Sequence, residues 1–430
     1  MLERLFHLKA HQTTVRTEIL AGVTTFLTMA YVLFVNPSIL AKTGMDQGAV
    51  FVATCLAGAL GSLIMGLWAN YPIALGPGMG LNAFFTYTVV MTMGYTWQVG
   101  LGAVFLSGLL FFALSIFRIR EWIIHSIPLP LRTAISAGIG LFLALIALKN
   151  TGIVVDHPAT LVALGDLAQP GPLLAGLGFV LIVALVHHRV TGAVMLGILA
   201  VTGASLALGL THLNGLVAPP PSLLPTLLQL DIAGALDVGL VSVIFAFLFV
   251  DLFDTSGTLI GVAQKAGLVG PDGKLPRLGR ALLADSTATM AGAVLGTSTT
   301  TSFIESTAGI SAGGRTGLTA CVVAALFLLS LFFSPLAAAV PDYATAPALF
   351  FVAVLMTGGL AQIAWDDLSE AAPVMVAALS MPLTFSIANG IALGFISWTA
   401  IKLLCGRRHE LNSAMWVLSA LFVVKLGFFA

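Results

Sequence analysis

Long apolar stretches with few charged interruptions dominate the chain from residue 19 onward. A helix needs about 20 apolar residues to cross the hydrocarbon core of a bilayer. Spans are expected at 19–39, 47–69, 78–93, 98–117, 131–149, 172–187, 190–211, 237–263, 281–296, 301–313, 316–339, 345–363, 371–387 and 389–404. A last stretch, 411–429, either spans the bilayer or lies along its interface. The pattern predicts an all-α polytopic membrane protein with about fourteen transmembrane helices.

The composition agrees with this pattern. Of the 430 residues, 58% are apolar and only 8% are Asp, Glu, Lys or Arg, whereas soluble domains carry roughly 25% charged residues. With a mean hydropathy of +1.05, lipid must be the solvent for most of the chain. This excludes a cytosolic enzyme, a nucleic-acid binder and a disordered scaffold. Cys55, Cys321 and Cys405 are expected to be small core residues, not a disulfide framework or a metal site.

Basic residues indicate the orientation of the chain. The first apolar run, from about Ile19 to Leu40, is too long for a signal peptide, so we expect it to remain as a transmembrane helix. With the N-terminus in the cytoplasm, alternation of the spans places most basic residues inside, among them Arg189, Arg407 and Arg408. We therefore expect an integral protein of the cytoplasmic (inner) membrane with both ends in the cytoplasm.

The two halves of the chain have the same order of apolar and irregular segments. Each half has a short apolar segment after an irregular stretch, opened by Gly76 or Gly296, with Asn82 or Ser302 six residues later. Since seven spans is an odd number, the second half must be inverted. Inverted repeats with interrupted helices in matching positions are typical of secondary transporters, which bind substrate near the midplane. The expected segments are a cytoplasmic N-terminus (1–18), a first seven-helix repeat (19–211), an extracytoplasmic loop (212–236), a second, inverted repeat (237–404) and a tail helix (405–430).

Ionisable residues inside the expected spans are the strongest functional signal, because each costs roughly 2.5–3.5 kcal/mol at the membrane centre. Asp251 and Asp254 are three residues apart and share a helix face, with Thr255 close to it. Glu305 follows the hydroxyl-rich run 297–302, which must line a cavity or bond neighbouring backbone. We interpret these carboxylates as binding a substrate, a proton or both. The alternative is that an aspartate caps a helix or pairs with a basic residue.

Two other charged residues favour a structural interpretation. Asp285 and Arg315 are expected near span ends, where capping or snorkelling accounts for them.

Other residues complete a candidate pocket. Asn82 offers a donor and an acceptor just inside the first short segment, and half-helix N–H groups add donors. Phe84, Phe85 and Phe253 can stack on a planar ring, although such residues usually serve packing. A planar heterocycle with mixed donors and acceptors suits this set.

Several stretches together resemble the AzgA-like purine permeases, a branch close to the nucleobase–cation symporters and nucleobase–ascorbate transporters. They are EILAGVTTFLTMAY (18–31), VNP (35–37), GMGLNAFF (78–85), LFDTSGTL (252–259), GTS (296–298), IES (304–306) and GGRTGLTA (313–320).

The resemblance implies fourteen helices in two inverted seven-helix repeats. A core domain (19–117 and 237–339) holds the substrate between strand-bearing segments of helices 3 and 10, and a gate domain (122–211 and 345–404) forms a homodimer. It also implies proton-coupled nucleobase import by an elevator movement, with no other cofactor. By position, the helix-8 acid corresponds to Asp254 or Asp251, the helix-10 acid to Glu305 and the helix-3 polar residue to Asn82, although some relatives have an amide where Asp251 stands.

The residues and the resemblance together predict a purine importer for adenine, guanine or hypoxanthine. The candidate proton-coupling residues are Asp251, Asp254 and Glu305. The candidate substrate-binding residues are Glu305, Asp254, Asn82, Asp251, Phe85, Phe253, Thr255, Thr301 and Ser302. One rival is an anion transporter or channel on the same fold, which favours a basic midplane residue. A membrane-embedded enzyme needs a metal cluster or a nucleophile with its base, and the chain has no HExxH, GxSxG or P-loop pattern.

Overall fold

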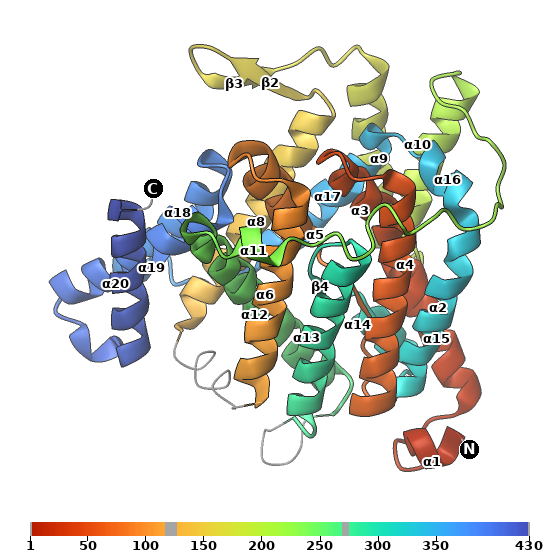
Figure 1. Cartoon of the computed structure of the whole chain (residues 1–430), viewed down its shortest axis with the longest axis horizontal. Coiled ribbons are helices and arrows are strands. Elements are labelled where there is room, and N and C mark those ends of the chain that lie inside the picture. The colour runs from red at the N-terminus through yellow and green to blue at the C-terminus, as the bar shows by residue number, and fades with distance from the viewer. Residues whose placement is uncertain (1, 117–126, 269–274, 429–430) are drawn as a thin grey trace.

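The structure, a computed structural model, describes residues 2–116, 127–268 and 275–428, and these are almost entirely helical (Figure 1). Within these ranges, eight helical segments are long and apolar enough to cross a bilayer. They are Val15–Ala41, Gln47–Ala69, Trp97–Ile116, Leu129–Asn150, Pro170–His187, Gly317–Ala339, Asp342–Gln362 and Ile387–Leu404. Shorter apolar helices cover Ala193–Ala207, Leu240–Leu252, Leu368–Leu383 and Ser413–Val424. The chain is therefore a predominantly helical polytopic membrane protein, as its apolar pattern predicts.

The first half of the chain contains nine described helices and three short strands. Its helices are α1 (Leu2–Phe6), α2 (Val15–Met29), α3 (Val32–Ala41), α4 (Gln47–Ile64), α5 (Met79–Ala83), α6 (Trp97–Ile116), α8 (Leu129–Asn150), α9 (Pro170–His187) and α10 (Ala193–Ala207). Two π-helical turns, Met65–Ala69 and Phe84–Thr92, extend α4 and α5. The strands are β1 (Leu75–Pro77), β2 (Val154–His157) and β3 (Leu161–Leu164), of which β2 and β3 form a hairpin.

The second half begins after a long connection. Its helices are α11 (Ile232–Ala235), α12 (Val238–Lys265), α13 (Leu278–Leu295), α14 (Ser306–Ser311), α15 (Gly317–Ser330), α16 (Ser334–Ala339), α17 (Asp342–Thr357), α18 (Leu368–Leu383), α19 (Ile387–Leu404) and α20 (Ser413–Phe428). Three 3₁₀ turns cover Leu331–Phe333, Gly358–Gln362 and Arg408–Glu410. Strand β4 (Thr300–Ser302) precedes α14.

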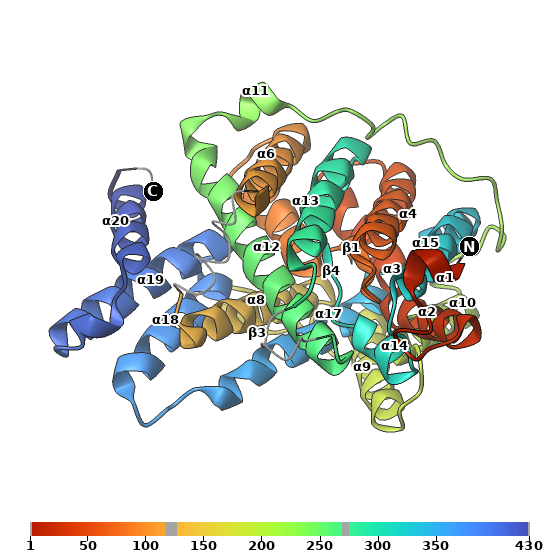
Figure 2. The same cartoon turned by 90° about the horizontal axis from the view of Figure 1, so that it is seen from below.

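A two-stranded antiparallel sheet joins the halves at the centre of the molecule. Strand β1 pairs with β4, with Gly76 opposite Thr301. The ladder continues at both ends, because Gly78 N donates to Thr299 O (2.9 Å) and Phe303 N donates to Ala74 O (2.9 Å). In both views this pair lies among α4, α12 and α13 (Figures 1 and 2). Two interrupted segments thus satisfy their backbone groups against each other where water is scarce.

Several expected spans are not single helices. The range 19–39 divides into α2 and α3, which meet at Ala30-Tyr31, with Pro37 inside α3. The range 78–93 is α5 followed by a π-helical stretch, and 301–313 is the end of β4 followed by the six-residue α14. A run of apolar residues specifies burial in lipid, but it does not distinguish a helix from a strand that finds a partner.

Two groups of helices pack mainly among themselves. The core group comprises α2–α6 and α12–α15, in which α4 and α13 contact several neighbours. The gate group comprises α8–α10 and α17–α19, centred on α8, which packs against α17, α18 and α19. Helix α20 packs on α19 and lies at the edge of the molecule opposite α1 (Figure 2).

One cysteine differs from expectation. Cys55 is buried and Cys321 is half-buried, but Cys405 is exposed. It directly follows the last residue of α19, beyond the packed part of the helix. The expectation of a core position for Cys405 is therefore wrong.

Candidate functional site

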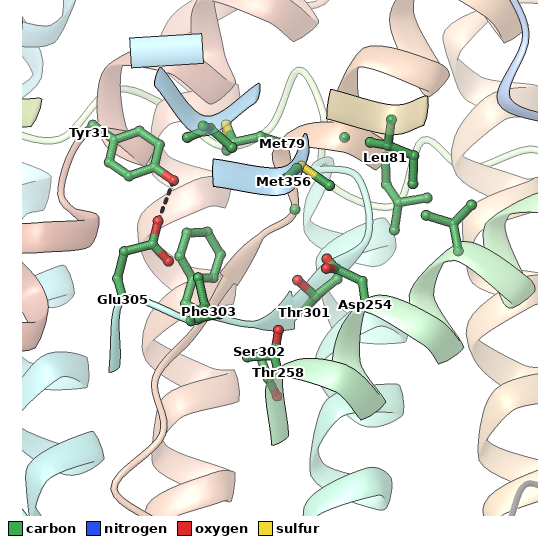
Figure 3. Close-up of a pocket in the computed structure, with 16 residues that line it drawn as sticks. Tyr31, Met79, Leu81, Asp254, Thr258, Thr301, Ser302, Phe303, Glu305 and Met356 are labelled. Atoms are coloured by element: carbon green, nitrogen blue, oxygen red, sulfur yellow. Dashed lines mark hydrogen bonds between the residues drawn. The ribbon is translucent and has the colours of Figure 1, made fainter. Parts of the chain in front are cut away.

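A cavity of about 90 Å³ lies beside the β1–β4 pair, between the core group and the gate group. Its lining comes from six segments far apart in sequence (Figure 3). The lining residues are Tyr31, Gly78, Met79, Gly80, Leu81, Ile139, Val250, Asp254, Thr258, Thr301, Ser302, Phe303, Ile304, Glu305, Val352 and Met356.

Helix α12 supplies one acidic side of the cavity. Asp254 faces it, and Thr258, one turn later, lines it as well (Figure 3). Thr301 of β4 lies next to Asp254, and Ser302 lies next to Thr258 (Figure 3). Gly78 makes this close arrangement possible, because a Cβ there would lie 3.1 Å from Thr301 Cγ2. This side of the cavity therefore combines a carboxylate with hydroxyl groups.

Glu305 supplies the other acidic side, held by the junction of α2 and α3. Tyr31 Oη donates a 2.8 Å hydrogen bond to Glu305 Oε1, and Thr28 Oγ1 donates to the carbonyl oxygen of Glu305 (3.4 Å). Asp254 and Glu305 approach the cavity from opposite sides (Figure 3). Tyr31 was not expected from the sequence, although it ends the first motif, where a tyrosine in an apolar span is a usable signal.

The remaining wall is apolar. Ile139 of α8 and Val352 and Met356 of α17 come from the gate group, and Phe303 and Met79 complete the lining. The cavity therefore combines two carboxylates with a surface that suits the face of a flat ring.

A buried polar network lies behind β4. Thr255 Oγ1 is 2.9 Å from Asp285 Oδ2 and 3.2 Å from Asp251 Oδ1. Ser302 Oγ donates to Asp285 Oδ1 (2.9 Å), and Thr289 Oγ1 bonds the carbonyl oxygen of Thr300 (2.9 Å). The network ties α12, α13 and β4 together directly beneath the cavity.

This network corrects the expectation for Asp285. It lies in the middle of α13 and is fully buried, so it is neither a helix cap nor a snorkelling residue. Ser302 of β4 provides one of its partners, and the sequence around residue 285 does not reveal this contact. Asp251 and Thr255 also lie in this network and do not line the cavity.

Asn82 lies behind the cavity as well. Its Nδ2 donates to Asn36 Oδ1 (2.5 Å), and Asn36 Nδ2 donates to Thr54 Oγ1 (2.7 Å) and Thr297 Oγ1 (2.9 Å). This cluster connects α3, α4, α5 and the segment before β4. Asn82 is completely buried, and its side chain does not reach the lining.

The expected aromatic residues are not those that line the cavity. Phe84 packs edge-to-face on Phe247, with ring centroids 5.1 Å apart. Phe85 is buried against α6, where a Cβ on Gly100 would lie 2.7 Å from its ring. The side chain of Phe253 lies outside the described residues. Tyr31 and Phe303 are the aromatic lining residues among those that the structure describes.

The motif 313–320 begins a helix. The carboxylate of Glu18, fully buried in α2, accepts hydrogen bonds from the backbone N–H groups of Arg315 (2.9 Å) and Thr316 (3.2 Å) and from Thr319 Oγ1 (2.6 Å). The Arg315 guanidinium donates to the carbonyl oxygens of Ile310 and Gly314. Arg315 therefore lies at the end of a span, where the sequence predicts it.

No group of three or more His, Cys, Asp or Glu side chains within the described ranges is arranged to hold a metal ion.

Known proteins resemble this chain in fold and in sequence. The transmembrane domain of a cyanobacterium bicarbonate transporter, BicA, superimposes with a TM-score of 0.66 at 15% identity, covering 87% of this chain and 97% of that domain. At this identity the likeness concerns the fold alone.

Sequence relatives are much closer. Adenine permease AdeP of Escherichia coli K12 is 51% identical over 428 residues, covering 100% of this chain and 96% of that protein. Guanine/hypoxanthine permease PbuO of Bacillus subtilis 168 is 45% identical over 432 residues, covering 98% of this chain and 99% of that protein. The model of the Permease family matches residues 16–393. The chain therefore belongs to the Permease family and is an AzgA-like purine permease, as its motifs predict.

Proposed function

We propose that this protein imports a purine nucleobase, adenine before guanine or hypoxanthine, together with protons. The observation that carries the proposal is the cavity in which Asp254 and Glu305 converge on an apolar wall. Carboxylates accept hydrogen bonds from the N–H groups of a purine, and Phe303 and the methionine side chains provide surface for the ring face. The 51% identity with a protein named adenine permease supports adenine as the first substrate to test.

Each residue has a role in this proposal. Glu305 and Asp254 bind the N–H edges of the base, and Thr301 and Ser302 add hydroxyl contacts. Asp251, Phe253 and Thr255 belong to α12, which carries Asp254, and Asn82 and Phe85 belong to α5 and the π-helical stretch after it. Asp251, Asp254 and Glu305 are the proposed proton carriers.

The two groups of helices support a proposal of alternating access. We propose that the core group, carrying the base, moves past the gate group as an elevator. The full chain would have fourteen spans in two inverted repeats, with both ends in the cytoplasm and a homodimer formed through the gate domain. The gate side of the cavity supports this, because Ile139, Val352 and Met356 are apolar there and apolar contacts are not directional.

An anion carrier on the same fold is not proposed. The described lining contains two carboxylates, and no Lys, Arg or His side chain is among its residues. Two acidic groups repel an anion.

The test is uptake of labelled adenine by the purified protein in proteoliposomes. An inward proton gradient in sodium-free buffer should drive accumulation, a protonophore should abolish it, and unlabelled adenine should compete better than guanine, hypoxanthine, xanthine or uracil. Accumulation that requires sodium would refute the proton coupling, and the absence of purine competition would refute the substrate class.

A matched pair of variants localises the activity. Asp254→Asn removes a charge from the cavity, whereas Asp156→Asn removes one from the exposed hairpin β2–β3. Uptake should be lost in the first and unchanged in the second.

A further inference from the structure

The junction of α2 and α3 contacts Glu305 at two points. Tyr31, the residue before α3, donates to the carboxylate, and Thr28, near the end of α2, donates to the backbone carbonyl. The residues joined by the phenol hydrogen bond are 274 positions apart. One segment of the core group thus fixes both the backbone and the side chain of Glu305.

Tyr31 itself is firmly held. Its side chain is 2% exposed, so the phenol cannot turn away from Glu305 without moving its neighbours. A phenol has one hydrogen to donate, and here it goes to Oε1 of the carboxylate. A hydrogen bond to a charged group is stronger than one between neutral groups.

The consequence concerns the second carboxylate oxygen. No side chain of the described residues donates to Glu305 Oε2, and Glu305 lines the cavity. A free glutamate side chain samples several rotamers, and ordering it on binding reduces affinity. With Oε1 held by Tyr31, that ordering is complete before a ligand arrives, and Oε2 is left to accept an N–H group.

We propose that Tyr31 is the positioning residue of the substrate site: its phenol fixes the carboxylate of Glu305 in the orientation that binds the base. This inference rests on the proposed function, because it concerns the affinity for a purine. It goes beyond it by assigning a role to a residue that touches the base only through Glu305.

The first experiment measures binding and transport of adenine by Tyr31→Phe, which keeps the ring and removes the hydroxyl. The dissociation constant and KM for adenine should rise roughly tenfold, as expected for one hydrogen bond to a charged group, while the maximal uptake rate stays within about twofold. Tyr87→Phe is the matched control, because Tyr87 bonds Asn150 away from the cavity. It should bind adenine like the wild type.

The second experiment requires no purine. The infrared carboxyl band of Glu305 is the band that Glu305→Gln removes. Tyr31→Phe should shift this band in the ligand-free protein, and Tyr87→Phe should not. An unshifted band would refute the hydrogen bond itself.

The outcomes separate the two proposals. Wild-type adenine affinity in Tyr31→Phe would overturn the positioning role and leave the proposed function intact. A wild-type protein that binds no purine would overturn both, even if the infrared band shifts. If Tyr31→Phe does not fold, the wild type with isotope-labelled tyrosine decides: adenine must perturb a tyrosine C–O band, and its constancy would refute the role.

Discussion

The core and gate groups differ most in what they bury. The core group buries Asp251, Asp285, Asn36 and Asn82 completely, each with hydrogen-bond partners. The helices of the gate group bury mainly aliphatic and aromatic side chains. Hydrogen bonds are directional and fix geometry, whereas apolar contacts are not. The comparison teaches that directional hydrogen bonds hold the group with the carboxylates, whereas its neighbour presents an apolar side to the cavity. Polar contacts join the two groups elsewhere, as between Ser38 Oγ of α3 and Asp342 Oδ1 of α17 (2.6 Å).

Several ion pairs of the gate group lie where α18 begins and α19 ends. Lys402, at the end of α19, contacts Glu410 (2.6 Å) and Glu370 (3.6 Å), and Arg407 pairs with Asp367 at the start of α18. These ion pairs lie away from the cavity lining. They fasten α18 to α19.

The largest effect is expected at Glu305. Glu305→Gln should lower purine accumulation roughly a hundredfold, because a neutral amide replaces the charged acceptor. The measurement is labelled adenine uptake, normalised to the amount of protein in the membrane, with the exposed Glu3→Gln as control. Near-normal uptake would remove Glu305 from the mechanism.

Loss of Asp285 tests the rigidity of the core group. Asp285→Ala leaves the hydroxyls of Ser302 and Thr255 without this acceptor, and each buried unsatisfied group costs about 1–3 kcal/mol. We expect thermal unfolding of the purified protein several degrees lower and uptake reduced about tenfold. Asp285→Asn, which keeps an acceptor oxygen, should lose less. Equal melting of Asp285→Ala and the wild type would contradict the role of this network.

The contact between the core group and the gate group is tested at Gly80. A Cβ there would lie 2.5 Å from Ile139 Cγ2 across the boundary of the two groups, and overpacking costs about 1–3 kcal/mol. Gly80→Ala should lower the maximal uptake rate roughly fivefold, and adding Ile139→Ala should restore it. Gly176→Ala, where a Cβ meets open space, is the control. A double variant as slow as Gly80→Ala would argue against this contact.

The smallest effect is expected in the ion pairs of the gate group. Hydrogen bonds from Ser369, and then from Arg407, lower the pKa of Asp367 to about 2. Because the folded pKa lies below the ordinary value of about 3.9, the stabilisation is complete above that value and disappears only as the pH falls toward 2.

Asp367→Asn should therefore lower the unfolding temperature slightly, by the same amount at pH 5 and pH 8, with KM unchanged. Asp366→Asn, at the exposed neighbouring position, is the control. A difference that changes between these pH values would mean that another group titrates.

The sequence predicts part of the site. Asp254, Glu305, Thr301 and Ser302 are recognisable because charge and hydroxyl groups interrupt apolar runs, and all four line the cavity. Phe303 is not recognisable in this way, since an apolar side chain is unremarkable in a membrane helix. Nor does the sequence separate the cavity from the layer behind it, where Asn82 and Asp251 lie.

The amino-acid sequence alone determines that this chain spans a membrane, and it singles out Asp251, Asp254 and Glu305 as acidic residues within apolar segments. The reason is that the penalty of lipid for a polar group acts on each segment separately. Only the tertiary structure decides the partners: Tyr31 for Glu305, and Ser302 for Asp285. Those pairings depend on how two interrupted segments meet as β1 and β4, and a contact between residues hundreds of positions apart leaves no trace in the local pattern of either one.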